Sequence, residues 1–230
     1  MKKTALLSAL LLSSVLTAQA FAAAQNPVLD YRRTLSLAIG QKNINLEAPR
    51  DMCFLDESDP VQGNLLDGMK AAAAQREQGQ VVGVFTDCLA IANLAKPDNP
   101  LGMTNAGMVM WMNPIVGAKT DMVRDDYVAA RATTLPQFVA SNLTMFKSAA
   151  VDEKASIQDG AAMVGYIAGA EVEYQKFVVS GITAATVIEG LPLDFTMTRI
   201  SDKKIEYKKE LQDLMSSFVT QQITLNEKNK

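Results

Sequence analysis

Apolar and polar residues follow two different periods in the first half of the chain. They alternate over residues 43–49, which predicts a half-buried strand, and residues 81–87 form a mostly apolar run, which predicts a buried one. Between these strands, apolar residues recur at helical spacing, at Leu65, Leu66, Met69, Ala72 and Ala73. A strand, a helix and a strand joined by a right-handed crossover form a parallel pair, so we expect the two strands to lie parallel in one sheet.

The residues around the expected helix fit its two ends. Asp59 can cap the first turn, Pro60 fits inside that turn, and Gln62 completes a capping-box pattern. Gly79 is typical of a helix C-terminus, because glycine readily adopts the left-handed conformation found there. The pattern therefore predicts a helix that begins directly after Asp59 and ends before Gly79.

Two further segments complete the first two thirds of the chain. Residues 107–114, GMVMWMNP, predict a strand that a proline ends. Residues 121–148 are predicted to be mostly helical, but Pro136 interrupts them, and proline is tolerated only in a first turn or at a kink. We therefore expect Thr133 or Thr134 to cap a new segment there.

The pattern changes in the last third, where residues 161–200 are rich in β-branched and aromatic residues with glycine between them. The sequence EGLP at residues 189–192 predicts a tight hairpin turn, and hence an antiparallel meander of three or four strands. From Asp202 onward, one apolar stripe predicts a closing helix, formed by Tyr207, Leu211, Leu214, Phe218 and Leu225. Together these elements predict an α+β, single-domain sandwich: a mixed sheet with a C-terminal β-meander, packed helices and an amphipathic C-terminal helix.

Residues 161–226, a strand, a hairpin and a long helix, resemble the closing unit of PsbP-like and DcrB-like α/β/α sandwich proteins. The chain as a whole also looks like the uncharacterised exported proteins of proteobacteria. The resemblance is one of pattern and includes no family motif, so it transfers no functional residue. It implies a layered sandwich fold and a small accessory or binding role.

The N-terminus has the three parts of a secretory signal peptide. Lys2 and Lys3 provide a basic start, residues 5–16 form an apolar run, and small residues follow at cleavage-like spacing. The apolar run is too short to span a bilayer. Its opening, MKKTALL, is similar to the signals of Gram-negative bacteria. We therefore expect the protein to be periplasmic or secreted.

We expect cleavage near Ala20 or Ala22, so that residues 1–22 are the signal peptide and residues 23–230 form one exported domain. The mature chain of about 208 residues suits a single domain, and it contains no transmembrane segment. Without the two signal lysines it has 20 basic and 25 acidic residues, a formal charge of −5. This acidic balance argues against binding to nucleic acid, which requires a basic face.

The chain contains no histidine. Its absence excludes serine-histidine and cysteine-histidine catalysis, histidine-ligated zinc and a histidine pH switch. An enzyme built from this chain would have to use carboxylates, lysine, tyrosine or a bound cofactor. No cofactor-binding motif is present, and we expect no cofactor.

Cys53 and Cys88 are the only cysteines, and an exported protein meets an oxidising compartment. Each lies just beyond one of the two strands expected to be neighbours, so a bond between them is within reach. Closing a loop of about 36 residues contributes about 4 kcal/mol in the chain-entropy model. The flanking residues are acidic and no C-x-x-C motif occurs, which disfavours a redox-active pair. We predict a structural disulfide.

Met108, Met110 and Met112 alternate in the expected strand and so lie on one face, with Trp111 on the other. Copper(I) favours thioether ligands, which makes these methionines the sharpest ligand hypothesis in the sequence. Methionine is also a common filler of apolar cores, and the chain uses it in several other segments. We favour the core interpretation and keep the copper site as a weaker hypothesis.

The leading functional hypothesis is a non-enzymatic periplasmic or secreted accessory or binding protein, stabilised by one disulfide. Its partner would be a protein or a small molecule that the sequence does not identify. The alternative is a histidine-independent hydrolase or isomerase that uses carboxylates or lysine. A methionine-based copper carrier is a third hypothesis. No pair of catalytic residues stands out, so no catalytic residue is assigned.

Overall fold

The computed structural model describes residues 32–75, 79–94, 105–112, 121–172, 175–201 and 207–227. The expected signal peptide lies outside these residues. The strands are β1 (Thr34–Ile39), β2 (Lys42–Glu47), β3 (Met52–Phe54), β4 (Gln80–Asp87), β5 (Asn105–Trp111), β6 (Ser148–Val151), β7 (Ser156–Gln158), β8 (Ala161–Val172), β9 (Gln175–Ile188) and β10 (Leu191–Ser201). The helices are α1 (Pro60–Gln75), α2 (Cys88–Ile91), α4 (Arg124–Asn142) and α5 (Lys208–Glu227).

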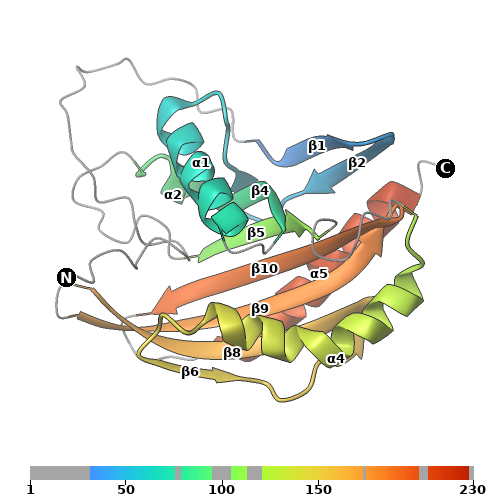
Figure 1. Cartoon of the computed structure of the whole chain (residues 1–230). Helices are drawn as coiled ribbons and strands as arrows, with labels where there is room; N and C mark the ends of the chain where they lie inside the picture. The colour runs from blue at the N-terminus through green and yellow to red at the C-terminus, as the bar shows by residue number, and fades with distance from the viewer. Residues whose placement is uncertain are drawn as a thin grey trace.

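These elements form three layers around an eight-stranded sheet of order β3-β4-β5-β10-β9-β8-β6, in which β7 also pairs with β8. Helices α1 and α4 cover one face, called the α4 face below. Helix α5 and the separate β1-β2 hairpin cover the other, called the α5 face (Figure 1). The α+β class, the C-terminal meander and the closing helix are therefore confirmed.

The expected parallel pair is wrong. Residues 43–49 cover most of β2, which pairs with β1. The strand that pairs with β4 is β3, and it does so antiparallel. The reason is a turn after β2, in which Met52 N donates to the Pro49 carbonyl at 3.0 Å and Asp51 has a φ of 64°. All strand pairs among the described residues are antiparallel, so the sheet there is not mixed.

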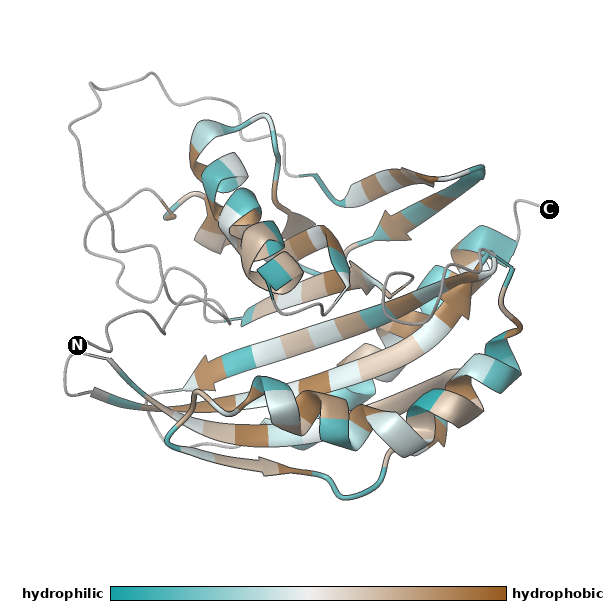
Figure 2. Cartoon of the chain, viewed as in Figure 1, coloured by the Kyte–Doolittle hydropathy of each residue, from teal (hydrophilic) through white to brown (hydrophobic). Residues whose placement is uncertain are grey.

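The meander β8-β9-β10 follows the sequence prediction. Glu189 and Gly190 form the two-residue turn between β9 and β10, with φ values of 52° and 80°. Two successive positive φ values are typical of the type I′ turn, whose twist matches that of the strands it joins. Most residues of these long strands are buried and few are strongly hydrophilic (Figure 2), because each strand has one face under α4 and the other under α5.

Helix α1 begins where the capping pattern placed it. The Asp59 carboxylate accepts hydrogen bonds from the backbone N–H groups of Val61 and Gln62, at 3.0 and 2.9 Å. The Gln62 side chain does not return to Asp59, as a capping box requires; its Oε1 accepts from the Asp56 N–H at 2.8 Å instead. The cap therefore orders the loop before the helix as well as its first turn.

Helix α4 runs through Pro136 without ending, so the expected new segment at Thr133 or Thr134 is wrong. The Thr133 hydroxyl donates to the Ala130 carbonyl at 2.8 Å, within the helix. Pro136 has no N–H, so it cannot donate to the carbonyl of Ala132, four residues earlier. The buried side of the helix, which contains Leu135 and Val139, holds it against the sheet despite this lost bond.

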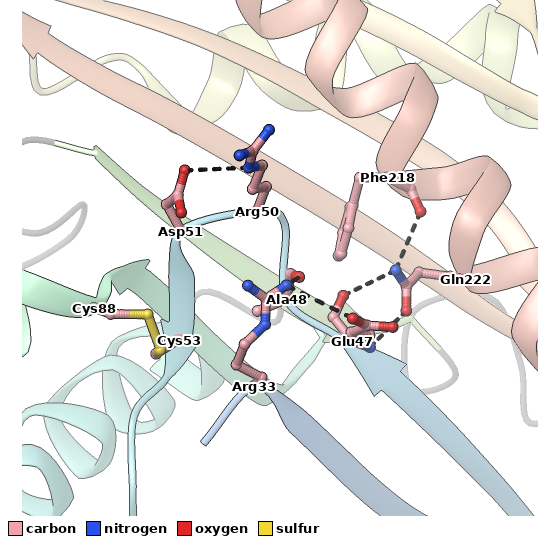
Figure 3. A network of polar contacts seen from close by, with 9 residues as sticks. All are labelled: Arg33, Glu47, Ala48, Arg50, Asp51, Cys53, Cys88, Phe218 and Gln222. Atoms are coloured by element: carbon pink, nitrogen blue, oxygen red, sulfur yellow. Dashed lines mark hydrogen bonds and ion pairs between the residues drawn. A yellow bond between two sulfur atoms is a disulfide. The ribbon is translucent and has the colours of Figure 1, made fainter. Parts of the chain in front are cut away.

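The β1-β2 hairpin is attached to α5 by side-chain amides. Gln222 Oε1 accepts from the Glu47 N–H at 2.9 Å, and its Nε2 donates to the Glu47 carbonyl at 3.0 Å (Figure 3). Asn226, one turn further along α5, makes the same pair of bonds to the backbone of Asn45, at 2.9 and 2.8 Å. The two amides thus satisfy the backbone groups along the otherwise open edge of β2.

The core on the α5 face joins residues from distant parts of the chain. The Phe218 ring of α5 lies 5.4 Å from the Phe85 ring of β4 and 5.3 Å from the Phe195 ring of β10, between ring centroids. Phe54 of β3 meets Phe85 edge-on at 5.6 Å. These four rings connect the edge of the sheet to its centre, and they fix α5 as the cover of this face.

Candidate functional site

A surface pocket of about 640 Å³ lies between α4 and the connection from β6 to β7. One wall is a face of α4 and the other is a short stretch of edge backbone. The apolar side chains of these two walls form what is called the floor of the pocket below, and they belong to Ala132, Pro136, Ala140, Val151 and Ala155. The lining residues are Ala132, Thr133, Pro136, Gln137, Ala140, Val151, Asp152, Glu153, Lys154 and Ala155.

The wall opposite α4 is an interruption in the edge of the sheet. Strands β6 and β7 both pair with β8, and the residues between them leave the edge. Asp152, the first residue after β6, fixes the β6-β7 connection to β8. Its N–H donates to the Gly165 carbonyl at 2.9 Å, and its Oδ2 accepts from the Gly165 N–H at 3.0 Å. Lys208 Nζ donates to the other carboxylate oxygen at 2.6 Å. Glu153 and Lys154 follow and are exposed.

The α4 wall is built by residues that recur every four positions, Ala132, Pro136 and Ala140. Small side chains leave space there, and Pro136 deprives the Ala132 carbonyl of its usual donor. Gln137 and Thr133 stand beside them on the exposed side. The β6-β7 connection thus leaves the edge of the sheet where it faces the turn of α4 that contains Pro136.

A buried polar cluster lies on the other side of α4. Asp194, fully buried on β10, accepts hydrogen bonds from the Tyr127 hydroxyl at 3.2 Å and from the Arg131 guanidinium. Burial raises the pKa of the Asp194 carboxyl, although Arg131 and Tyr127 act to lower it. Burial also raises the pKa of Tyr127. The cluster joins α4 to β10, and within it the Asp194 carboxylate and the Arg131 guanidinium form an ion pair.

Arg131 makes two further contacts of note. Its guanidinium lies 4.8 Å from the centroid of the Phe138 ring, one turn along the same helix. Its Nε is buried, and within the described residues it has no hydrogen-bond acceptor. The Arg131 side chain is only 10 % exposed. The cluster therefore holds α4 against the sheet and is not open to a ligand.

A second polar network spans one end of the sheet. Asn105 of β5 donates to Asp87 of β4 at 2.7 Å and accepts from Arg199 Nε of β10 at 2.6 Å. Arg199 also pairs with Glu210 of α5 at 2.9 Å, and its guanidinium lies 4.6 Å from the centroid of the Tyr207 ring. Each charged group in this network faces a partner, so the network ties three strands to α5.

The structure brings the two cysteines together, as predicted. Cys53 and Cys88 form a disulfide with a Cα–Cα distance of 4.9 Å. The route differs from the expected one, because Cys53 lies in β3 opposite Thr86 of β4, two residues before Cys88. Cys53 is fully buried and Cys88 is half-buried. The bond closes the edge of the sheet onto the short helix α2 (Figure 3).

Met108 and Met110 of β5, and Met112 directly after it, lie on the α4 face in one apolar cluster with α1. Met110 and Met112 are buried and Met108 is half-buried; Met69 of α1 joins them. Trp111 packs into the core on the opposite face. The packing accounts for the methionines as core residues, and the copper hypothesis remains a prediction that the structure does not test.

Sequence reasoning missed both Asp194 and the pocket. Asp194 had a visible signal, since it is the one charged residue in the segment LPLDFTM of β10. The pocket had only Pro136, which indicated an irregular helix but not what faces it. In the described part of the chain, no group of three or more cysteine, aspartate or glutamate residues is placed to hold a metal ion. None of its helices is both long and apolar enough to cross a membrane.

No protein-family model matches the chain, and no curated protein matches it in sequence. One similar solved structure is LpqN, involved in cell envelope biogenesis of Mycobacterium tuberculosis, with a TM-score of 0.38 and 12% identity over 85% of this chain and 88% of that one. Another is PA94 from Pseudomonas aeruginosa, a protein of unknown function and putative regulator, with a TM-score of 0.29 and 8% identity over 80% of this chain and 95% of that one. Similarity at this level carries no argument about function. The resemblance to PsbP-like and DcrB-like proteins stays a prediction.

Proposed function

We propose that this chain is an exported, disulfide-stabilised binding protein without catalytic activity, and that its ligand site is the pocket between α4 and the β6-β7 connection. The observation that carries the proposal is the pocket itself. It is open to solvent, it has an apolar floor, and its volume falls in the range of about 300–1,000 Å³ that is usual for ligand sites.

The chemistry of the remaining polar groups supports a binding role. The chain has no histidine. In the buried cluster Asp194 pairs with Arg131, and at the sheet end Arg199 pairs with Glu210. These groups serve the packing of α4 and α5 on the sheet.

Export supports the proposed location and is tested first. The full chain is produced in a Gram-negative host, and its periplasmic fraction is examined by intact-mass spectrometry. We expect a mass that corresponds to cleavage near Ala22 and no free thiol under denaturant. A chain that stays in the cytoplasm with residues 1–22 attached would overturn the export part of the proposal.

The ligand site is tested with the fluorescent apolar anion anilinonaphthalenesulfonate. We expect saturable binding to the folded protein that the Ala140→Trp substitution removes, because indole fills the space beside Pro136. The matched control is Ser141→Trp, an exposed position on the same helix that does not line the pocket. Equal binding to both variants would place the probe elsewhere. Turnover of esters, amides or phosphoesters that one aspartate, glutamate or lysine substitution abolishes would establish an enzyme instead.

A further inference from the structure

We propose that the pocket binds a short apolar peptide whose two ends are free and charged. This inference rests on the proposed function, that the pocket is a ligand site, and it adds the chemical class of the ligand. Three properties of the pocket support it: its apolar floor, the charges on its rim and the backbone groups at its border.

The floor suits small apolar side chains. Ala132, Pro136 and Ala140 from α4 face Val151 and Ala155 from the sheet edge, and together they offer methyl and ring carbons without charge. A volume of about 640 Å³ is too large for one amino acid and accommodates a peptide of a few residues. Burial of leucine-like side chains on this floor supplies the main favourable free energy.

The rim carries one charge of each sign. Glu153 and Lys154 are adjacent and exposed, and neither takes part in an ion pair among the described residues. The third charged residue of the segment, Asp152, is committed to Lys208 and Gly165. A ligand with a single charge would be attracted by one of these two side chains and repelled by the other. A zwitterion with separated charges satisfies both, with its ammonium group at Glu153 and its carboxylate at Lys154.

The border offers backbone hydrogen bonds of the kind a peptide makes. The Ala132 carbonyl lacks the donor that Pro136 cannot supply. Strand β6, which ends at Val151 on the pocket wall, is the last strand on its side of the described sheet. Residues 148–150 of β6 are exposed and include no proline or charged side chain that would block pairing. The backbone of β6 beside Val151 is therefore open to hydrogen bonds from a peptide that lies in the pocket.

The test compares two forms of one tripeptide, alanyl-leucyl-alanine with free ends and the same peptide with an acetyl and an amide cap. Binding to the mature protein is followed by chemical-shift changes in amide-resolved NMR spectra. We expect the free form to bind with shifts confined to residues 132–140 and 148–155. Exposed ion pairs are individually weak, so we expect the capped form to bind about five- to tenfold more weakly.

The substitutions Glu153→Gln and Lys154→Gln, made together, are expected to reduce binding of the free peptide to that of the capped one. They leave the apolar floor intact, and both side chains are exposed, so folding is retained. Ala140→Trp is expected to abolish peptide binding, whereas Ser141→Trp is expected to leave it unchanged.

Each outcome decides one question. Equal affinity for free and capped peptides would overturn the role of the charged ends. Binding of anilinonaphthalenesulfonate that Ala140→Trp removes, without binding of either peptide, would overturn the peptide class and leave the proposed ligand site standing. Failure of the probe and of both peptides to bind would overturn the proposed function together with this inference.

Discussion

The side-chain amide of Gln222 binds the backbone of Glu47 as a neighbouring strand would, accepting from its N–H at 2.9 Å and donating to its carbonyl at 3.0 Å. The two residues are 175 positions apart in the chain. Gln222 is completely buried and also donates to the Phe218 carbonyl of its own helix at 3.2 Å. The hairpin thus depends on a helix side chain for bonds that a sheet would normally supply from backbone.

The first prediction concerns this clamp. Gln222→Ala leaves the N–H and the carbonyl of Glu47 without partners at a partly buried position, and unpaired groups of this kind cost about 1–3 kcal/mol each. We expect the free energy of unfolding to fall by about 2–4 kcal/mol in urea titrations. Thr224→Ala, an exposed position on the same helix, is the matched control. Equal stability of the two variants would show that the clamp contributes nothing measurable.

The second prediction concerns the disulfide. Reduction of the bond between Cys53 and Cys88, which are 35 positions apart, frees a long loop in the unfolded chain. In the chain-entropy model this lowers the free energy of unfolding by about 4 kcal/mol. The measurement is urea unfolding with and without a reductant, and the double substitution to alanine serves as a control that reductant must not affect. An unchanged midpoint on reduction would contradict a stabilising role.

The third prediction concerns pH. Burial raises the pKa of Asp194 above the value of about 3.9 that it has in the unfolded chain. The folded state therefore binds the Asp194 proton more tightly than the unfolded chain does. This contribution to the free energy of unfolding is complete below about pH 4, and it is lost as the pH rises through the folded pKa. The stability of the wild type minus that of Asp194→Asn should fall across this window, by about 1.4 kcal/mol per unit of pKa difference. A difference that rises with pH would mean that pairing with Arg131 outweighs burial.

The fourth prediction concerns the methionines. Met110 is 3 % exposed, whereas Met108 is only half-buried, so Met110→Ala should leave the larger cavity. We expect a loss of about 2–5 kcal/mol for Met110→Ala and a smaller one for Met108→Ala. If the methionines serve only as core, titration with reduced copper will give no dissociation constant tighter than micromolar. A tighter constant that Met108→Leu weakens would revive the copper hypothesis.

Local features of the fold were predictable because their causes are local. The cap at Asp59 and the turn at Glu189 and Gly190 depend on residues within a few positions of each other. The three methionines fell on one face because strand periodicity alone determines it. The disulfide was predicted correctly although the strand arrangement used to argue for it was wrong.

Pairing partners and the pocket were not predictable in the same way. The pattern of residues 43–49 identified a strand but not its neighbour, and the turn that separates β2 from β3 depends on a single positive φ at Asp51. The pocket is formed by residues of α4 and of the β6-β7 connection, whose approach is set by the packing of Leu135 and Val139 on the sheet. The hydrophobic periodicity of the sequence carries no information on how closely α4 approaches the β6-β7 connection.

The amide clamp on β2 also sets an order of events. Gln222 and Asn226, which cover the β2 edge, are synthesised 175 and 181 residues after their hairpin partners, Glu47 and Asn45. Until then the hairpin has an open edge and no helix above it. During translation, or during any transport that starts from the N-terminal side, the hairpin therefore cannot complete the hydrogen bonds of its β2 edge until α5 has followed it.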